Sequence, residues 1–354
     1  MPINLIAAAD ALAQLDHFDD VIDARSPGEY ALDAIPGAAN WPSLDDEQRI
    51  VIGTLYKQTG GFEAKKAGAA LVARNIAAHI EQHAPNMPRT WQPLLYCWRG
   101  GNRSGSLATV LSAIGFKVSL IEGGYKAFRA TVMAQTPELV KPLQLRVVAG
   151  ATGVGKTHVL HALERLGAQT IDLEGIAKHR SSVLGVIPGT PQPSQKAFET
   201  QLWHKLQSLD PNRPVYIESE SKRVGNVTVP ESLITAMRAS PCHHLSMDTE
   251  SRVRLLMRDY DFFVNDSALF CERLDTLIAL LGRATIEQWQ ALARNGESAQ
   301  VVAQLLDGHY DPKYFESMAR NFALYKSANQ IVVANDSQNS IEATAASILA
   351  FDAA

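Results

Sequence analysis

The chain has 354 residues, of which 46% are hydrophobic and 20% are charged, and its formal net charge is −4. Such a composition is typical of a globular protein with two or three domains, and it excludes a disordered or strongly basic chain. Composition therefore gives no support for nucleic-acid binding. No apolar run approaches the length of a membrane span, and the N-terminus does not resemble a signal peptide. Because the three widely spaced cysteines form no disulfide framework, we expect a cytoplasmic protein.

Strands and helical segments alternate through residues 1–135, which we expect to form a first domain. This alternation predicts a parallel sheet of the α/β class. Ligands bind at the carboxyl ends of strands in such sheets, and Cys97 directly follows one predicted strand. In chain order the expected elements are a strand at 19–25, a helix from 26, an extended stretch at 35–42, helical residues 44–84, a strand at 94–96, a helix at 107–114, a strand at 117–121 and a tight turn at 122–125.

A glycine-containing loop joins the 94–96 strand to the next predicted helix, and it begins with the thiol of Cys97. The backbone N–H groups of such a loop and the positive end of the following helix both favour an anion. That anion can be the Cys97 thiolate, which is a nucleophile, or an oxyanion of sulfur, selenium or phosphorus. The alternative is a buried structural cysteine. We expect Cys97 and Arg103 to be catalytic and the rest of the loop to bind the oxyanion: Trp98, Arg99, Gly100, Gly101, Asn102 and Ser104.

Several ordered motifs accompany this loop: Asp23-Ala24-Arg25, Glu29-Tyr30, Ile35-Pro36-Gly37-Ala38 with Asn40, and Glu122-Gly123-Gly124 followed by an aromatic residue. Together with the Cys97 loop they resemble a rhodanese domain, which implies that fold and a reactive thiol. The spacing departs from many rhodaneses because Arg103 lies six residues after Cys97. Cys-x5-Arg is also the spacing of the phosphatases that share the fold, and the longer loop could hold an oxyanion larger than a sulfane sulfur.

A proline-marked linker at 136–142 is expected to end the first domain, and a second domain is expected at 143–354. It opens with an apolar strand at 143–149 that runs directly into Gly-Ala-Thr-Gly-Val-Gly-Lys-Thr, residues 150–157. This G-x-x-x-x-G-K-[ST] pattern between a strand and a helix predicts a phosphate-binding P-loop. Lys156 would reach a terminal phosphate and Thr157 would hold Mg²⁺. The phosphate-binding residues expected here are Gly150, Thr152, Gly153, Gly155, Lys156 and Thr157.

Further strands are expected at 169–172, 214–218, 243–247 and 330–334, and residues from about 250 to 328 are expected to form a helical insertion. These elements predict an α/β domain of the P-loop NTPase or kinase-like type. Glu218 ends a strand and resembles a Walker-B acid that holds Mg²⁺ or a water, with a solvated strand end as the alternative. Arg254 and Arg258 share a helix face, where they either bind phosphates as a lid or are solvated.

Four local sequences and the order of the two domains extend the resemblance beyond the rhodanese motifs. They are the loop at 97–104, the segments 55–58 and 62–65, and the P-loop at 150–157. The combination resembles the tRNA 2-selenouridine synthase family over nearly the whole chain. Family members replace the sulfur of 2-thiouridine at the tRNA wobble position with selenium from selenophosphate, and they transfer a geranyl group from geranyl diphosphate to that sulfur. The resemblance implies a transferase that uses these three substrates, with Mg²⁺ and no tightly bound organic cofactor.

Two other functional classes remain open on the residues alone. One is a rhodanese-type sulfurtransferase or a Cys-x5-Arg phosphatase with a regulatory nucleotide-binding module, and the other is a small-molecule kinase whose first domain is a docking scaffold. We expect a monomer without membrane association. Basic residues that are candidates for tRNA contact, or else ordinary surface charges, are Lys57, Lys65, Lys66, Lys178, Arg180, Lys222 and Arg223.

Overall fold

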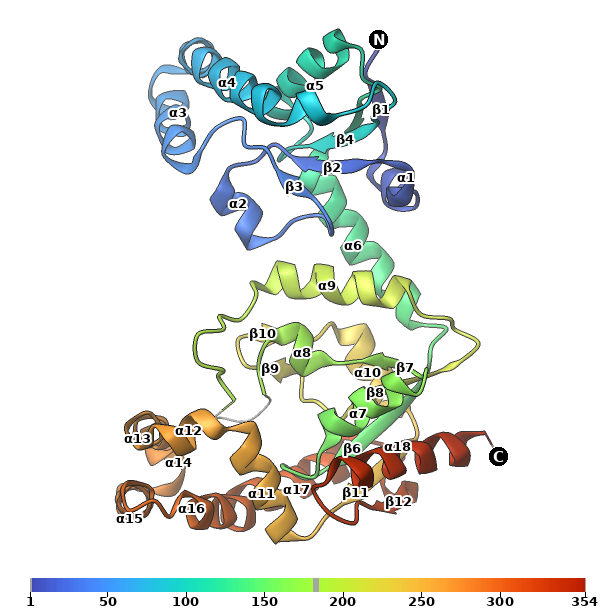
Figure 1. The fold of residues 1–354 in the computed structure, drawn as a ribbon, viewed down its shortest axis with the longest axis vertical. Helices are drawn as coiled ribbons and strands as arrows, with labels where there is room; N and C mark the ends of the chain where they lie inside the picture. The colour runs from blue at the N-terminus through green and yellow to red at the C-terminus, as the bar shows by residue number, and fades with distance from the viewer. Residues whose placement is uncertain (1, 181–184, 354) are drawn as a thin grey trace. The chain divides into compact units, whose positions relative to one another are not determined.

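A computed structural model describes residues 2–180 and 185–353 of the chain. The chain divides into two compact units (Figure 1): Met1–Thr136 with Glu199–His204, and Pro137–Phe198 with Lys205–Ala354. The division falls within helix α6 (Gly124–Val140), which includes Pro137. The linker predicted at 136–142 is therefore wrong over residues 136–140, which are helical. Pro137 lies in the last turn of this helix, and its missing N–H removes one helical hydrogen bond.

The first unit is built on a parallel sheet with the strand order β1-β5-β4-β2-β3, which confirms the predicted α/β class. All four residues of β4 are buried, as expected for a central strand covered on both faces. The residues directly after β4 therefore lie at the middle of the sheet's carboxyl edge. The strands are β1 (Asn4–Ile6), β5 (Ser119–Ile121), β4 (Pro93–Tyr96), β2 (Asp20–Asp23) and β3 (Ala39–Asn40).

Helices flank this sheet, and the segment predicted to be helical at 44–84 forms a helical hairpin that bends at Gly60. Asp45 caps the first helix of the hairpin by accepting a hydrogen bond from the Gln48 backbone N–H at 2.7 Å. A hydrophobic cluster that includes Trp41, Trp91 and Leu107 packs beneath the helices. The helices are α1 (Ala8–Leu12), α2 (Pro27–Leu32), α3 (Asp46–Thr59), α4 (Gly61–His83), α5 (Asn102–Ile114) and α6, with short turns η1 (Leu15–His17) and η2 (Ala84–Asn86).

The second unit contains a parallel sheet with the strand order β12-β11-β6-β8-β7. From the central strand β6 the chain first builds β7 and β8 on one side and later β11 and β12 on the other. Such a switch point opens a crevice at the carboxyl end of the central strand, where ligands bind in α/β proteins. The strands are β6 (Gln144–Gly150), β7 (Gln169–Ile171), β8 (Pro214–Glu218), β11 (Cys242–Ser246) and β12 (Asn329–Val332), and a separate antiparallel pair is formed by β9 (Arg223–Val224) and β10 (Val227–Thr228).

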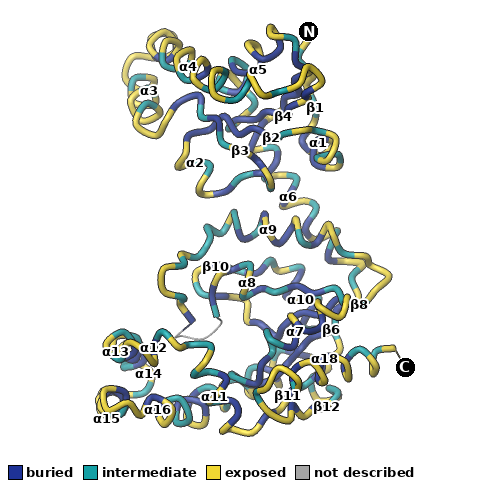
Figure 2. Tube along the Cα trace, in the orientation of Figure 1, coloured by how far each residue is buried: buried dark blue, intermediate teal, exposed yellow. Residues whose placement is uncertain are grey.

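Helices α7 and α18 pack on this sheet through a cluster that includes Val148, Leu160 and Ile341. The predicted helical region at about 250–328 has its own core, in which Phe263, Phe270 and Trp289 are buried. Figure 2 shows buried segments, in dark blue, along the helices of this region. The helices are α7 (Lys156–Arg165), α8 (Leu173–Ala177), α9 (Gln195–Gln207), α10 (Glu231–Ala239), α11 (Thr249–Asp259), α12 (Asp261–Asn265), α13 (Ser267–Asp275), α14 (Ile278–Leu281), α15 (Arg283–Arg294), α16 (Ser298–Leu305), the π-helical turn η3 (Leu306–Tyr310), α17 (Asp311–Asn321), the turn η4 (Tyr325–Ser327) and α18 (Gln338–Asp352). Within the described ranges, no helix combines the length and apolar character needed to cross a membrane.

Candidate active site

The thiol of Cys97 lies between the end of β4 and the first residue of α5, Asn102. Cys97 is 3% exposed, and its Sγ lies 3.9 Å from the carbonyl oxygen of Gly101. Burial alone does not distinguish it from Cys242 and Cys271, which are also buried. What distinguishes it is the position at the carboxyl edge of the sheet and the N-terminus of a 13-residue helix, where an anion is favoured.

Glycines hold the Cys97 loop against the turn that follows β5. Gly124 has a φ of +56°, and a Cβ atom at this position would lie 2.2 Å from the carbonyl oxygen of Cys97. Gly100 has a φ of +66°, and its Cβ would lie 2.7 Å from the carbonyl oxygen of Ile121. The Tyr125 N–H donates to the Cys97 carbonyl at 2.8 Å. The Glu122-Gly123-Gly124 motif therefore supports the loop, because only glycine allows this close approach of two backbones.

Arg103 lies in the first turn of α5 and forms an ion pair with Glu29, with Nη1 and Oε2 2.6 Å apart. Burial by itself would raise the pKa of the Glu29 carboxyl, but the hydrogen bond and charge of Arg103, together with the Ser26 N–H and the charge of Arg49, outweigh it and the pKa is lowered. The guanidinium is thus held by Glu29, and the loop offers its backbone N–H groups and the exposed side chains of Arg99 and Asn102 as further oxyanion donors.

The other predicted loop residues differ in exposure. Arg99, Gly101 and Asn102 are exposed, and Trp98 is partly buried and stacks on Tyr125 with ring centroids 5.3 Å apart. Ser104 is fully buried, and its hydroxyl has no hydrogen-bond partner within the described part of the chain. The structure therefore brings the predicted residues together around one turn, with Ser104 on its inner side.

A buried polar network underlies the loop, and sequence reasoning used its residues only as family markers. Arg25 is 1% exposed and pairs with Asp23 at 2.6 Å. Its guanidinium lies 3.9 Å from the ring centroid of Tyr125, and the Tyr125 hydroxyl donates to Asp33 at 2.8 Å. Since Tyr125 also binds the Cys97 carbonyl through its backbone, this network positions the loop from below.

The P-loop follows β6 as predicted and turns into α7 at Lys156. Gly153 and Gly155 have a φ of +82°, and a Cβ at Gly150 would lie 2.6 Å from Val154 Cγ2. Lys156 Nζ donates to the Gly150 carbonyl at 2.9 Å. A cavity of about 800 Å³ opens at this loop. The predicted residues that line it are Thr152, Gly153, Gly155, Lys156 and Thr157.

Glu174, to which sequence reasoning assigned no role, is the carboxylate next to Thr157. Its Oε2 accepts a hydrogen bond from the Thr157 hydroxyl at 3.1 Å, and its backbone N–H donates to Glu218 Oε1 at 2.9 Å. Mg²⁺ is held in proteins by one or two carboxylates or hydroxyls, with substrate phosphates and waters as the other ligands. Thr157 and Glu174, both lining the cavity, fit such an ion.

The alternative of a solvated strand end for Glu218 is wrong, because this residue is fully buried. Burial, reinforced by the charges of Glu174, Glu220 and Asp172, raises the pKa of its carboxyl well above the ordinary value. Glu218 does not belong to the lining of the cavity among the described residues, and it contacts the site through the backbone of Glu174. Its side chain positions α8 rather than facing solvent.

Arg254 and Arg258 share a face of α11, as predicted, but this face is turned to Asp336 and not to the P-loop cavity. Both guanidinium groups form ion pairs with the Asp336 carboxylate, and neither arginine lines the described cavity. Their expected role as a lid over phosphates is corrected accordingly.

Arg252, on the same helix, is the arginine that faces the P-loop. It is buried, donates to the Thr152 carbonyl from Nε at 2.9 Å and from Nη2 at 2.7 Å, and pairs with Asp311 at 2.6 Å.

The wall of the P-loop cavity carries both signs of charge. His158 contacts Asp259 at 3.0 Å and His161 contacts Asp172 at 2.7 Å. The hydrogen bond to Asp172 raises the pKa of His161. Of the basic residues considered for tRNA contact, Lys178 and Arg180 belong to the described lining. The remaining candidates, which do not, are Lys57, Lys65, Lys66, Lys222 and Arg223.

Comparison with known proteins assigns the two halves of the chain. A family model described as "Rhodanese-like domain" matches residues 7–131, and one described as "tRNA 2-selenouridine synthase AAA domain" matches residues 143–270. These matches confirm both resemblances inferred from the motifs.

Relatives over longer stretches carry the same name. A "tRNA 2-selenouridine synthase" of Pseudomonas putida (strain GB-1) is 33% identical over 84% of this chain and 87% of its own length. One of Shewanella piezotolerans is 29% identical over 95% and 97%. One of Sulfurovum sp. (strain NBC37-1) is 37% identical over 68% of this chain, and the chain covers 65% of that relative's length. The chain belongs to the tRNA 2-selenouridine synthase family.

Proposed function

We propose that the protein modifies tRNA by replacing the sulfur of wobble 2-thiouridine with selenium from selenophosphate, through an S-geranyl intermediate formed from geranyl diphosphate. The observation that carries the proposal is the presence of two different anion-binding loops in one chain of this family. The Cys97 loop follows the central strand of one sheet, and the P-loop follows the central strand of the other. Two such loops suit a reaction with two phosphorylated substrates.

The P-loop suits the alkylation step. Its backbone N–H groups and Lys156 would bind the diphosphate. The thiocarbonyl sulfur attacks C1 of the geranyl group, the C–O bond breaks, and diphosphate leaves with its charge stabilised by these groups. Thr157 and Glu174 would hold Mg²⁺, which supplies further neutralisation of the departing diphosphate.

The Cys97 loop suits the exchange step. Its N–H groups would bind the oxyanion of selenophosphate, and alkylation has by then made the sulfur of the base a better leaving group. The selenium of selenophosphate attacks C2 of the base, the C–S bond breaks and geranylthiol leaves, and water then cleaves the Se–P bond to release phosphate. In this step Cys97 positions selenophosphate. The other role considered, a transient Cys–Se carrier, would need a two-electron oxidant to form the S–Se bond, because the selenium of selenophosphate is at the selenide level. Dependence of selenation on an added oxidant therefore separates the two roles.

The test is mass analysis of nucleosides after thiolated tRNA has reacted with geranyl diphosphate and then with selenophosphate. We expect Lys156→Ala to block S-geranylation, and Cys97→Ser to accumulate the S-geranyl nucleoside without selenation. Cys242→Ala is the matched control, because burial raises the pKa of that thiol to about 11 and keeps it unreactive. Full selenation by Cys97→Ser would remove Cys97 from the mechanism.

The Cys-x5-Arg spacing supports a second candidate, a sulfurtransferase or phosphatase. A phosphatase would need the Arg103 guanidinium at its substrate, whereas Glu29 holds it at 2.6 Å. Incubation with thiosulfate and cyanide, or with a phosphoester, tests this candidate directly. Turnover of either substrate without tRNA would favour it over tRNA modification.

A further inference from the structure

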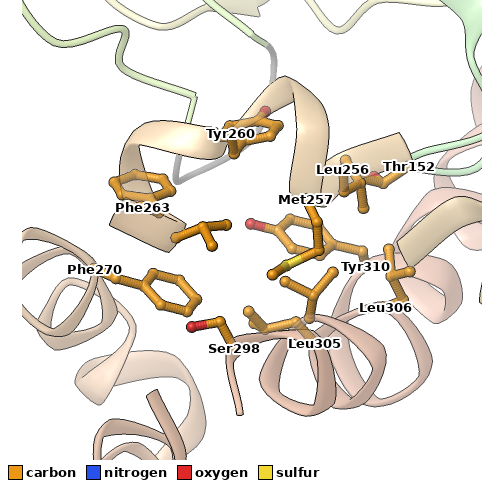
Figure 3. Close-up of a pocket in the computed structure, with 12 residues that line it drawn as sticks. Thr152, Leu256, Met257, Tyr260, Phe263, Phe270, Ser298, Leu305, Leu306 and Tyr310 are labelled. Carbon is orange, nitrogen blue, oxygen red and sulfur yellow. The ribbon is translucent and has the colours of Figure 1, made fainter. Parts of the chain in front are cut away.

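An apolar pocket lies beside the P-loop in the helical part of the second unit. Residues of α11, α12, α13, α16 and η3 form its wall, and aliphatic and aromatic side chains predominate (Figure 3). Figure 3 shows Met257 and Leu305 toward the middle, with Phe263 and Phe270 on the side away from Thr152. Among the described residues of the lining, polar side-chain groups come only from Thr152, Ser298 and the two tyrosine hydroxyls.

This pocket adjoins the phosphate site. Thr152, Leu256, Tyr260 and Tyr310 line both the apolar pocket and the large P-loop cavity. Thr152 is itself a P-loop residue, and its carbonyl oxygen is held by Arg252. A ligand whose phosphates bind the P-loop therefore meets an apolar opening where its other end continues.

The apolar lining of this pocket indicates which kind of ligand it can bind. A nucleotide base in this pocket would bury several donors and acceptors against few polar partners, which is unfavourable. A hydrocarbon chain has no such groups and gains by leaving water. The cavity of about 50 Å³ has room for roughly four water-sized spheres, which is comparable to one five-carbon isoprene unit.

We propose that this pocket receives the distal end of the hydrocarbon chain of an allylic diphosphate whose diphosphate binds the P-loop, and that Phe263 and Phe270 limit the chain length. The inference rests on the proposed function and adds the position of the chain and the residues that measure it. The two rings stack with centroids 5.3 Å apart and belong to the buried core of the helical region. They form a rigid end to the pocket that a chain longer than two isoprene units would have to displace.

The test measures equilibrium binding of inorganic diphosphate, geranyl diphosphate and farnesyl diphosphate to the full chain. Wild type is expected to bind geranyl diphosphate about tenfold or more tighter than inorganic diphosphate, because the buried chain adds to the shared phosphate contacts. Met257→Trp, which fills the pocket, is expected to abolish this advantage while leaving the affinity for inorganic diphosphate unchanged. Met133→Trp is the matched control, because Met133 is exposed in the first unit.

A second variant keeps the proposal testable if Met257→Trp folds poorly. Phe270→Leu is expected to bring the affinity for farnesyl diphosphate to within about threefold of that for geranyl diphosphate, with thermal unfolding confirming that the variant is folded. Equal binding of inorganic and geranyl diphosphate by wild type would overturn the pocket assignment while leaving the P-loop assignment intact. Unchanged geranyl diphosphate binding by a folded Met257→Trp variant would overturn it as well. Failure of wild type to bind any diphosphate would instead overturn the proposed function.

Discussion

Arg252 donates two hydrogen bonds to the carbonyl oxygen of Thr152 and also forms an ion pair with Asp311. It thereby ties α11 and α17 to the P-loop. The two exposed arginines of α11 bind Asp336 instead. The arginine of α11 that supports the P-loop is thus the buried Arg252.

We expect Arg252→Ala to weaken diphosphate binding and to lower the free energy of unfolding by about 3 kcal/mol, since Asp311 loses its partner. Arg252→Lys should give a diphosphate affinity and an unfolding free energy between those of wild type and Arg252→Ala, because one ammonium group cannot make both hydrogen bonds to Thr152 and the ion pair with Asp311. Binding titration and chemical denaturation measure both effects. Arg254→Ala, on the exposed face, is the control for binding and should leave the diphosphate affinity unchanged. Unchanged diphosphate affinity in Arg252→Ala would contradict the positioning role.

Gly124→Ala tests the support of the Cys97 loop. The added Cβ would lie 2.2 Å from the Cys97 carbonyl in a backbone with φ +56°, so we expect a loss of about 2–4 kcal/mol in unfolding free energy. Selenation should fall more than S-geranylation, because the P-loop is untouched. The control is Gly53→Ala in α3, where a Cβ meets nothing within 4 Å and should stabilise by up to about 1 kcal/mol. Equal losses in both reactions would argue against a local effect.

The ion pairs of Glu29 with Arg103 and Arg49 predict a pH-dependent contribution to stability. The pKa of Glu29 is lowered from its ordinary value of 4.5, so the contribution is full above that pH and is lost as the pH falls through the folded-state pKa. Chemical denaturation between pH 7 and pH 3 should show wild type more stable than Glu29→Gln at pH 7, with the difference shrinking in acid. The exposed pair Glu63–Lys66 supplies a control, because Glu63→Gln should show little difference at any pH. If the difference in unfolding free energy between wild type and Glu29→Gln did not change with pH, ion pairing of Glu29 would be excluded as the cause of that difference.

Glu174→Ala tests the assignment of Mg²⁺ to the P-loop. If Thr157 and Glu174 hold the ion, this variant should need about tenfold or more Mg²⁺ for half-maximal S-geranylation. Rates are measured across a Mg²⁺ titration, with a chelator as the zero point. Glu231→Ala removes an exposed carboxylate that pairs with Lys222 and should leave the titration unchanged. An S-geranylation rate that the chelator does not affect would refute the assignment.

Local patterns were sufficient to predict several features of this protein. The strand before Cys97, the glycines of the loop and the uninterrupted P-loop pattern each depend on neighbouring residues, and the structure forms them where they were expected. The helical spacing of Arg254 and Arg258 also predicted correctly that they share a face. These are properties of backbone geometry and periodicity, which a short segment determines.

What periodicity could not predict is which face of α11 meets the P-loop, because that depends on how the helix packs after the chain has folded. The same reason explains why Glu174 was missed and why Glu218 was assigned to solvent or metal. Their roles follow from the order β7-β8-β6, which brings Glu174 beside Thr157. The apolar pocket is likewise assembled from residues between Thr152 and Tyr310. The sequence by itself determined the two loops and their chemistry, whereas only the tertiary structure decided which distant side chains surround them, because those contacts are made across the sheet and not along the chain.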